Sequence, residues 1–255
     1  MHESGNRWAV ILCDVDAGSI KSGPSNVRDH WLSVLTAQWP DHPPPLFIDR
    51  RHGQIAARLV ESYCFAAVTA GLTPLVLGGD HATTYFAYSG VRQAIKAMPD
   101  LIHFDAHHDA WPAENITNYS FARHLRRQGV VVDSIGMREK WPSGMPSRRP
   151  ARESELVYLS IDVDVLDPQI LSAVSFPVPI GSHGPNTNLE WLGNQLNDAV
   201  DGRRLVAADI VEWVPMAAPD DPGDDVVGGV LSSVLQLPGL YGEDVTNQNT
   251  GSHAH

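Results

Sequence analysis

A glycine-rich turn places a histidine directly after a short apolar run of the chain. Residues 74–77, Pro-Leu-Val-Leu, are followed at 78–81 by Gly-Gly-Asp-His. Two glycines allow the backbone to turn sharply, so that the carboxyl end of a strand presents the imidazole of His81. His81 is therefore a candidate ligand. The alternative is a tight turn whose histidine caps a helix.

Three acidic or imidazole side chains follow the apolar run 101–104 at intervals of two. They are Asp105, His107 and Asp109. In an extended chain this spacing places all three on one side, where such groups repel one another unless a cation compensates them. The alternative is that the acids cap loops and the histidine lies at the surface. Two further histidines point the other way under the same alternation, and we expect them to pack or to support the first set: His103 and His108.

A third apolar run, 156–161, is again followed by acids two residues apart. These are Asp162 and Asp164, and two carboxylates on the same side of a buried strand end indicate a metal site. A third acid, Asp167, precedes a proline and is expected to form a turn rather than to bind a metal.

Together these segments supply six candidate metal ligands: His81, Asp105, His107, Asp109, Asp162 and Asp164. Six ligands exceed what one cation needs, whereas two divalent ions about 3.5 to 4 Å apart, sharing carboxylates, would satisfy the set. An oxygen-rich site with some imidazole suits manganese better than zinc. Two such ions balance four carboxylates, and a bound hydroxide would make the centre slightly anionic, which favours a cationic substrate.

Short apolar runs bounded by turn residues recur along the chain and predict buried strands. They span Trp8–Cys13, Pro74–Leu77, Leu101–Phe104, Val130–Ile135, Leu156–Ile161 and Arg204–Ile210. Segments with helical periodicity alternate with several of them: Gln54–Ala70, Thr83–Ala97, Tyr119–Gln128, Leu189–Val200 and Val226–Leu235. This alternation predicts an α/β fold, in which helices cover both faces of a mostly parallel sheet.

The length of 255 residues is consistent with one domain, which we place at residues 1–241. Two segments rich in Pro, Gly, Ser and Arg lack helical periodicity and are predicted to be long surface loops: 141–152 and 169–188. In an α/β fold such loops often contribute to the functional site. Residues 242–255 are polar and are expected to form a flexible tail.

The charge balance limits the classes of partner. The chain carries 18 Lys or Arg and 30 Asp or Glu residues, a net charge of −12, which argues against nucleic acid and anionic membranes as partners. Cys13 and Cys64 are too few and too far apart for a disulfide framework or a thiolate zinc site. We find neither a membrane-length apolar run nor a signal-peptide pattern, so we expect a cytoplasmic protein.

The three motifs resemble those of the ureohydrolase family, which includes arginase and agmatinase. The family motifs are Gly-Gly-Asp-His, Asp-Ala-His-x-Asp and Ser-x-Asp-x-Asp-x-x-Asp-Pro, and here they stand in order at 78–81, 105–109 and 160–168. Further matches extend the resemblance to about residues 23–237: Gly-Pro-Ser-Asn-Val-Arg at 23–28, Ile-Gly-Met-Arg-Glu at 135–139, Ser-Phe-Pro-Val-Pro at 175–179 and Asp-Ile-Val-Glu at 209–212.

The resemblance implies a three-layer αβα sandwich with a binuclear manganese centre, which hydrolyses a guanidino group to an amine and urea through a metal-bridging hydroxide. One ion would bind His81, Asp105, Asp109 and Asp162, and the other would bind Asp105, His107, Asp162 and Asp164, so that Asp105 and Asp162 bridge. Asp109 would orient the hydroxide. Glu212 would pair with the N–H groups of the guanidinium, and the alternative for Glu212 is a surface or salt-bridged acid.

Two departures from the family pattern leave the proton donor and the tail of the substrate open. Arginases and agmatinases have a His-Gly motif shortly after Asp-Ala-His-x-Asp, whereas residues 114–124 contain none. The candidate proton donors are His124, on a predicted helix, and His183, in the later loop. The arginase segment that reads the carboxylate of the free amino acid is also absent, and Glu139 is a candidate contact for a substrate amine.

The leading hypothesis is a manganese-dependent amidinohydrolase that acts on a small guanidino compound. One alternative is a peptide arginase that converts arginine side chains within a peptide to ornithine, which the altered substrate loop favours. Another is a metal-binding regulator without turnover. Deacetylases of the same fold superfamily use a single zinc, and six filled ligand positions disfavour them. Family similarity also implies a homo-oligomer, either a trimer or a hexamer.

Overall fold

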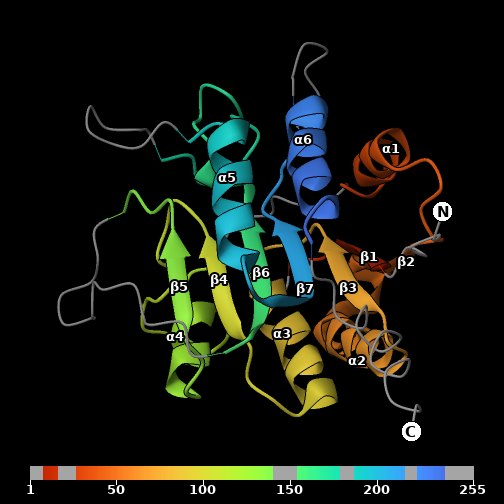
Figure 1. Cartoon of the computed structure of the whole chain (residues 1–255), viewed down its shortest axis with the longest axis vertical. Helices are drawn as coiled ribbons and strands as arrows, with labels where there is room; N and C mark the ends of the chain where they lie inside the picture. Colours follow the sequence, from red (N-terminus) through yellow and green to blue (C-terminus); the bar gives the residue numbers. More distant parts are fainter. Residues whose placement is uncertain (1–7, 17–26, 140–153, 179–186, 216–222, 239–255) are drawn as a thin grey trace, which may run out of the picture.

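A parallel sheet of seven strands forms the centre of the structure (Figure 1). The computed structural model describes residues 8–16, 27–139, 154–178, 187–215 and 223–238. The strands are β1 (Trp8–Asp14), β2 (Leu46–Asp49), β3 (Thr73–Leu77), β4 (Asp100–Phe104), β5 (Val132–Ile135), β6 (Leu156–Asp162) and β7 (Arg204–Val211). They lie in the order β2-β1-β3-β7-β6-β4-β5, and every neighbouring pair is parallel.

Two layers of helices cover the sheet (Figure 1). One layer holds α1 (Arg28–Gln38), α5 (Leu189–Val200) and α6 (Gly223–Leu235), and the other holds α2 (Ala56–Thr69), α3 (Ala82–Ile95) and α4 (Phe121–Arg127). Two short 3-10 helices, η1 (Arg50–Ile55) and η2 (Val163–Val165), follow β2 and β6. The predicted α/β fold, with helices on both faces of a parallel sheet, is confirmed.

Alternation along each central strand divides the apolar core in two. In β1, Val10 and Leu12 face the layer of α1, α5 and α6, whereas Ile11 and Cys13 face the layer of α2, α3 and α4. Because both faces of the strand are buried, its sequence is a continuous apolar run. This is why the strands that position the site could be found in the sequence.

Four neighbouring strands end at the same level of the sheet. Leu77 of β3 pairs with Ile210 of β7, Ile210 pairs with Ile161 of β6, and Ile161 pairs with Phe104 of β4. In parallel strands this register places the carboxyl ends side by side. The segments that follow these strands, which carry the predicted ligands, therefore meet at one edge of the sheet.

Two elements lie outside the predicted pattern. The helix α1 spans 11 residues and buries only Trp31, Val34 and Leu35, so its apolar stripe is too narrow to stand out in the sequence. The strand β2 has four residues at the edge of the sheet, and its Leu46 is exposed. The predicted strand 130–135 begins instead at Val132.

Part of the predicted loop and tail structure falls beyond what the structure describes. The predicted loop 141–152, the predicted tail 242–255 and the proposed domain boundary at residue 241 all lie outside the described residues. Within the predicted loop 169–188, Val174 forms an isolated antiparallel bridge with Trp213. No helix in the described part of the chain is long and apolar enough to cross a membrane.

Two glycines inside helices provide a matched test of the packing between layers. A Cβ at Gly90 of α3 would lie 2.1 Å from the carbonyl oxygen of Glu61 in α2, whereas a Cβ at Gly193 of α5 would meet nothing closer than Ser233 Oγ, at 3.9 Å. We predict that Gly90→Ala lowers the free energy of unfolding by about 1 to 3 kcal/mol through overpacking. Gly193→Ala should raise it by about 0.5 to 1 kcal/mol through helix propensity. Urea unfolding measures both, and equal effects of the two substitutions would contradict the close contact of α2 and α3.

Candidate metal centre

The turn after β3 needs both of its glycines. Gly78 has φ 90° and Gly79 has φ 84°, in the left-handed region that residues with a Cβ rarely adopt. A Cβ would lie 2.5 Å from the Cys13 carbonyl oxygen at the first position and 2.6 Å from Thr83 Oγ1 at the second. The turn delivers His81 to the start of α3, where its side chain makes no capping hydrogen bond. The histidine is thus directed elsewhere than to the helix end.

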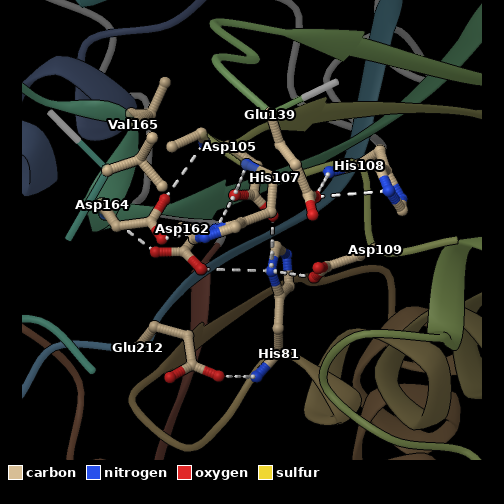
Figure 2. Close-up of polar contacts among 12 residues, drawn as sticks. His81, Asp105, His107, His108, Asp109, Glu139, Asp162, Asp164, Val165 and Glu212 are labelled. Atoms are coloured by element: carbon tan, nitrogen blue, oxygen red, sulfur yellow. Dashed lines mark hydrogen bonds and ion pairs between the residues drawn. The ribbon is translucent and has the colours of Figure 1, made fainter. Parts of the chain in front are cut away.

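The imidazole of His81 points at three carboxylates (Figure 2). Its Nδ1 lies 3.0 Å from Asp109 Oδ2, 3.2 Å from Asp105 Oδ2 and 3.4 Å from Asp162 Oδ2. All four residues are buried, and this Nδ1 makes no well-formed hydrogen bond within the described residues. A buried imidazole nitrogen that faces three acidic oxygens is the donor set of a metal ligand shell.

A second group adjoins the first and shares one acid with it. His107 Nδ1 lies 2.9 Å from Asp164 Oδ2 and 3.2 Å from Asp105 Oδ1. Possible ligand atoms lie within 4.8 Å of one another in each of two groups: His81, His103, Asp105 and Asp109 form one, and Asp105, His107 and Asp164 form the other. Asp105 belongs to both, so its carboxylate can bridge two cations.

Asp105, His107 and Asp109 converge by a different path from the one that their spacing predicts. Residues 105–110 do not continue β4 as an extended strand, and Asp109 has a left-handed backbone with φ 44°. The prediction that an extended chain aligns the three side chains is therefore wrong for Asp109. A local turn, rather than period-two alternation, brings its carboxylate to His81.

Burial and mutual repulsion raise the pKa values of three acids. Burial raises the pKa of Asp109 and of Asp162 well above the usual range, and neighbouring carboxylates add to the shift. Burial together with the charge of Asp105 raises the pKa of Asp164 to about 6. Because these groups are costly to ionise in isolation, the ionised cluster needs compensating positive charge.

Neighbouring carboxylates raise the pKa values of two imidazoles as well. Burial alone would lower the pKa of His81 and of His107, but contacts with carboxylates outweigh it, and the pKa of His107 rises to about 12. Burial would raise the pKa of Asp105, yet the surrounding histidines hold that pKa well below its usual value. Protons on imidazoles and acids provide the compensating charge when no cation is bound, and divalent ions would displace them.

A supporting layer holds the ligands in place. His103 Nε2 lies 2.7 Å from Asp105 Oδ2, and burial lowers the pKa of His103 to about 4, so a neutral imidazole donates its N–H to the acid. His81 Nε2 lies 3.0 Å from Ser160 Oγ, which in turn donates to Asp209 Oδ1 at 2.7 Å. Contacts of this kind fix the orientation of metal-binding side chains.

Glu212 lies beside the same turn, on a left-handed backbone with φ 64°. Its own N–H donates to the Gly79 carbonyl oxygen at 3.0 Å, and its Oε1 accepts hydrogen bonds from the His81 backbone N–H at 2.9 Å and from Asn118 Nδ2 at 3.4 Å. The second oxygen, Oε2, is buried and has no hydrogen-bond partner within the described residues. The carboxylate thus keeps one oxygen available for a ligand.

A cavity of about 280 Å³ adjoins these groups. It is lined by His107, Asp109, Trp111, Asn118, Tyr119, Asp162, Asp164, Phe176 and Glu212. Three of the candidate acids and Glu212 therefore face one space, together with three aromatic side chains. Such a space can hold a small organic cation above the acidic cluster.

Neither Glu139 nor His124, two other predicted site residues, lines this cavity. Glu139 accepts a hydrogen bond from Trp111 Nε1 at 3.3 Å and lies 3.3 Å from His108 Nε2, so its carboxylate supports the loop rather than lining the cavity. His124, in α4, packs against Tyr85 with ring centroids 6.4 Å apart. His183 lies outside the described residues.

Sequence reasoning missed four residues of the cavity: Trp111, Asn118, Tyr119 and Phe176. The first three lie in an irregular segment between β4 and α4, where the sequence lacks the His-Gly motif, and Tyr119 precedes α4 although the predicted helix 119–128 included it. The Ile-Gly-Met-Arg-Glu motif has a structural role, because Arg138 donates to the carbonyl oxygens of Asp164 and Val165 at 2.6 and 2.7 Å. It thereby clamps the segment that carries Asp164.

The parallel sheet between two helical layers, together with two groups of acids and imidazoles that share a carboxylate, defines this chain as an α/β protein with a candidate binuclear metal site. Residues 45–147 and 145–234 match the model of the Arginase family, and the chain belongs to this family.

Sequence comparison finds arginase and ureohydrolase relatives, and structure comparison finds the same fold. The mitochondrial arginase of Medicago truncatula is 31% identical over 172 residues, which cover 56% of this chain and 49% of that protein. An N(1)-aminopropylagmatine ureohydrolase of Thermus thermophilus is 29% identical over 183 residues, which cover 62% and 60%. The chain thus spans about half to three fifths of the length of these relatives. The structure of a hypothetical agmatinase from Burkholderia thailandensis shares the fold, with a TM-score of 0.68 and 21% identity over 91% of this chain and 85% of that one.

The supporting role of His103 leads to a prediction. His103→Phe keeps an aromatic ring beside Phe121 but removes the N–H that holds Asp105. We expect affinity for a divalent cation to fall about 10- to 100-fold, as is usual for the loss of a group that orients a ligand. Calorimetric titration with Mn²⁺ measures this. His42→Phe, in a turn outside the centre, is the control, and equal affinities of the two variants would count against the role of His103.

Proposed function

We propose that this protein is a manganese-dependent amidinohydrolase, which cleaves a guanidino group to an amine and urea. The observation that supports it most directly is Glu212. Its Oε2 is buried without a hydrogen-bond partner in the described part of the chain, and Glu212 lines the same cavity as three acids of the cluster. A carboxylate oxygen kept free at that place suits the N–H groups of a guanidinium.

The donor set fits a pair of divalent cations. We assign one ion to His81, Asp105, Asp109 and Asp162 and the other to Asp105, His107, Asp162 and Asp164. When bound, such cations lower the pKa of a coordinated water, so that hydroxide is available near neutral pH. A guanidinium is resonance-stabilised and a poor electrophile, which is why its hydrolysis needs this nucleophile.

The residues of the chain then have separate roles. Glu212 holds the guanidinium and aligns its carbon with the nucleophile, which Asp109 orients. Addition of hydroxide to that carbon gives a tetrahedral species, and the departing amine needs a proton before the carbon–nitrogen bond breaks. His124 packs against Tyr85 away from the cavity, so we favour His183, the substrate or water as the donor.

The substrate beyond the guanidino group is a separate question, because identities near 30% to an arginase and to an N(1)-aminopropylagmatine ureohydrolase do not choose between them. A peptide arginase remains the first alternative and a metal-binding regulator the second. A homo-oligomer and a cytoplasmic location stay predictions from the sequence.

Urea release in the presence of Mn²⁺ tests the proposal. The compounds to compare are L-arginine, agmatine, a shorter guanidino acid and an arginine-containing peptide. We expect a compound without the free α-amino acid group to be hydrolysed at least as well as L-arginine. Release from the peptide alone would favour the peptide arginase, and release from none of them would favour the regulator.

Metal content gives a second prediction. We expect two Mn²⁺ ions per chain and loss of activity with a chelator, because four buried carboxylates need that much positive charge. Asp162→Asn should lower metal binding and turnover more than Asp164→Asn does, since Asp162 would serve both ions. Elemental analysis and urea release measure these effects. One ion per chain, or full activity with zinc alone, would contradict a binuclear manganese centre.

Substitution of Glu212 tests the position of the guanidinium. Glu212→Gln keeps the size of the side chain and its contact with the His81 backbone but removes the charge. We expect turnover of guanidino substrates to fall about 100-fold or more, with metal content preserved. Steady-state urea release together with elemental analysis measures both. If turnover is unchanged, Glu212 is structural and the guanidinium assignment fails.

A further inference from the structure

A large exposed aromatic side chain stands at the cavity that holds the proposed reaction. Trp111 lies in the irregular segment after Asp109, lines the cavity and is 44% exposed. Exposure of an indole on this scale costs favourable burial free energy. What sets Trp111 apart from the other exposed apolar side chains in the described part of the chain is its place in the lining of this cavity.

Trp111 is held firmly in spite of its exposure. Its Nε1 donates to Glu139 Oε1 at 3.3 Å, and its ring packs on the ring of His108 with centroids 5.0 Å apart. Its backbone N–H donates to the Tyr119 carbonyl oxygen at 3.0 Å. The backbone of Glu139 is in turn bound to the segment that carries Asp105 and His107, because its N–H donates to the Ala106 carbonyl oxygen at 3.0 Å. The indole is thus preorganised rather than free to move aside.

Side chains of different character line the cavity. The lining combines carboxylates and His107 with three aromatic side chains: Trp111, Tyr119 and Phe176. The ring of Phe176 meets His107 edge-on, with centroids 6.5 Å apart. None of the described residues that line the cavity is Lys or Arg. A negatively charged tail would therefore meet no cationic side chain among them, whereas a positive one would find aromatic faces.

We propose that Trp111 is the specificity-determining residue for the tail of the substrate, and that its indole face binds an ammonium group carried by that tail. This inference rests on the proposed guanidino hydrolysis and names its substrate class: a guanidino compound that ends in an amine. Glu139 acts as a positioning residue, since it holds the indole through Nε1. Trp111 would thus make the contact with a substrate amine that the sequence analysis expected of Glu139.

Three guanidines of equal chain length isolate the charge of the tail. Each has a four-carbon chain, and they end in an amine, a methyl group or a carboxylate. With the wild-type protein and Mn²⁺, we expect kcat/KM for urea release to fall in the order amine, methyl, carboxylate. Trp111→Leu should reduce kcat/KM for the amine about 3- to 30-fold, the range of a cation–π contact, and should change the value for the methyl compound much less.

Two further variants control the comparison. Phe65→Leu removes an exposed aromatic ring from α2 and should leave all three values unchanged. Glu139→Gln keeps an oxygen that can accept the indole hydrogen bond, so the ratio of amine to methyl substrate should stay within about threefold of wild type. If Glu139→Gln abolishes that ratio while Trp111→Leu preserves it, the carboxylate recognises the amine directly and the inference is overturned.

The outcomes also separate this inference from the proposed function. No urea from any of the three compounds would contradict the proposed function itself. Urea release with the carboxylate compound preferred, or an equal loss for all three compounds in Trp111→Leu, would leave amidinohydrolysis intact and overturn the role of Trp111. Circular dichroism and metal content of the Trp111→Leu variant show whether the substitution leaves the fold and the metal centre intact.

Discussion

Repulsion among buried carboxylates is the constraint on which the rest of this structure depends. Asp105, Asp109, Asp162 and Asp164 are all buried near one another, and burial works against their ionisation. A chain can hold such a cluster only if its stability comes from elsewhere and if cations or protons balance the charge. The two apolar cores on either side of the sheet supply that stability. The buried acids of the candidate metal centre thus lower the stability of the protein locally, and the apolar cores compensate for this loss.

The parallel sheet holds the acids together, because its strands fix the segments that carry them. Four strand ends are level, so each motif needs only a short turn to reach the centre. Two of these turns contain a residue with a Cβ in the left-handed region, Asp109 at φ 44° and Glu212 at φ 64°. Each costs about 1 to 3 kcal/mol and persists only where the surroundings impose it. Here the surroundings are backbone hydrogen bonds, such as that from Glu212 to the Gly79 carbonyl oxygen.

The sequence predicted what depends on local pattern. Continuous apolar runs located five strands closely, and helical spacing located α5 at its observed bounds, 189–200. The positions of the candidate ligands followed because they come directly after such strands. The left-handed turn at Asp109 was missed, since a non-glycine residue adopts it only under tertiary contacts. Trp111 was missed for a similar reason: its indole is defined by Glu139 and His108, which no periodic pattern connects to it.

The acidic ligands could be predicted and the aromatic lining of the cavity could not, because the two are positioned by different kinds of contact. The acidic ligands are positioned by strand register, and any change there disturbs the charge balance of all the ligands. The aromatic side chains lie on irregular segments outside the strands, and a few contacts such as that of Trp111 with Glu139 hold them, so we expect a substitution at Trp111 to alter the cavity without moving β4 or β6. On the proposed function, chemistry and selectivity would therefore reside on different structural elements. A family can keep the reaction at the sheet edge while its members change the tail that the cavity accepts.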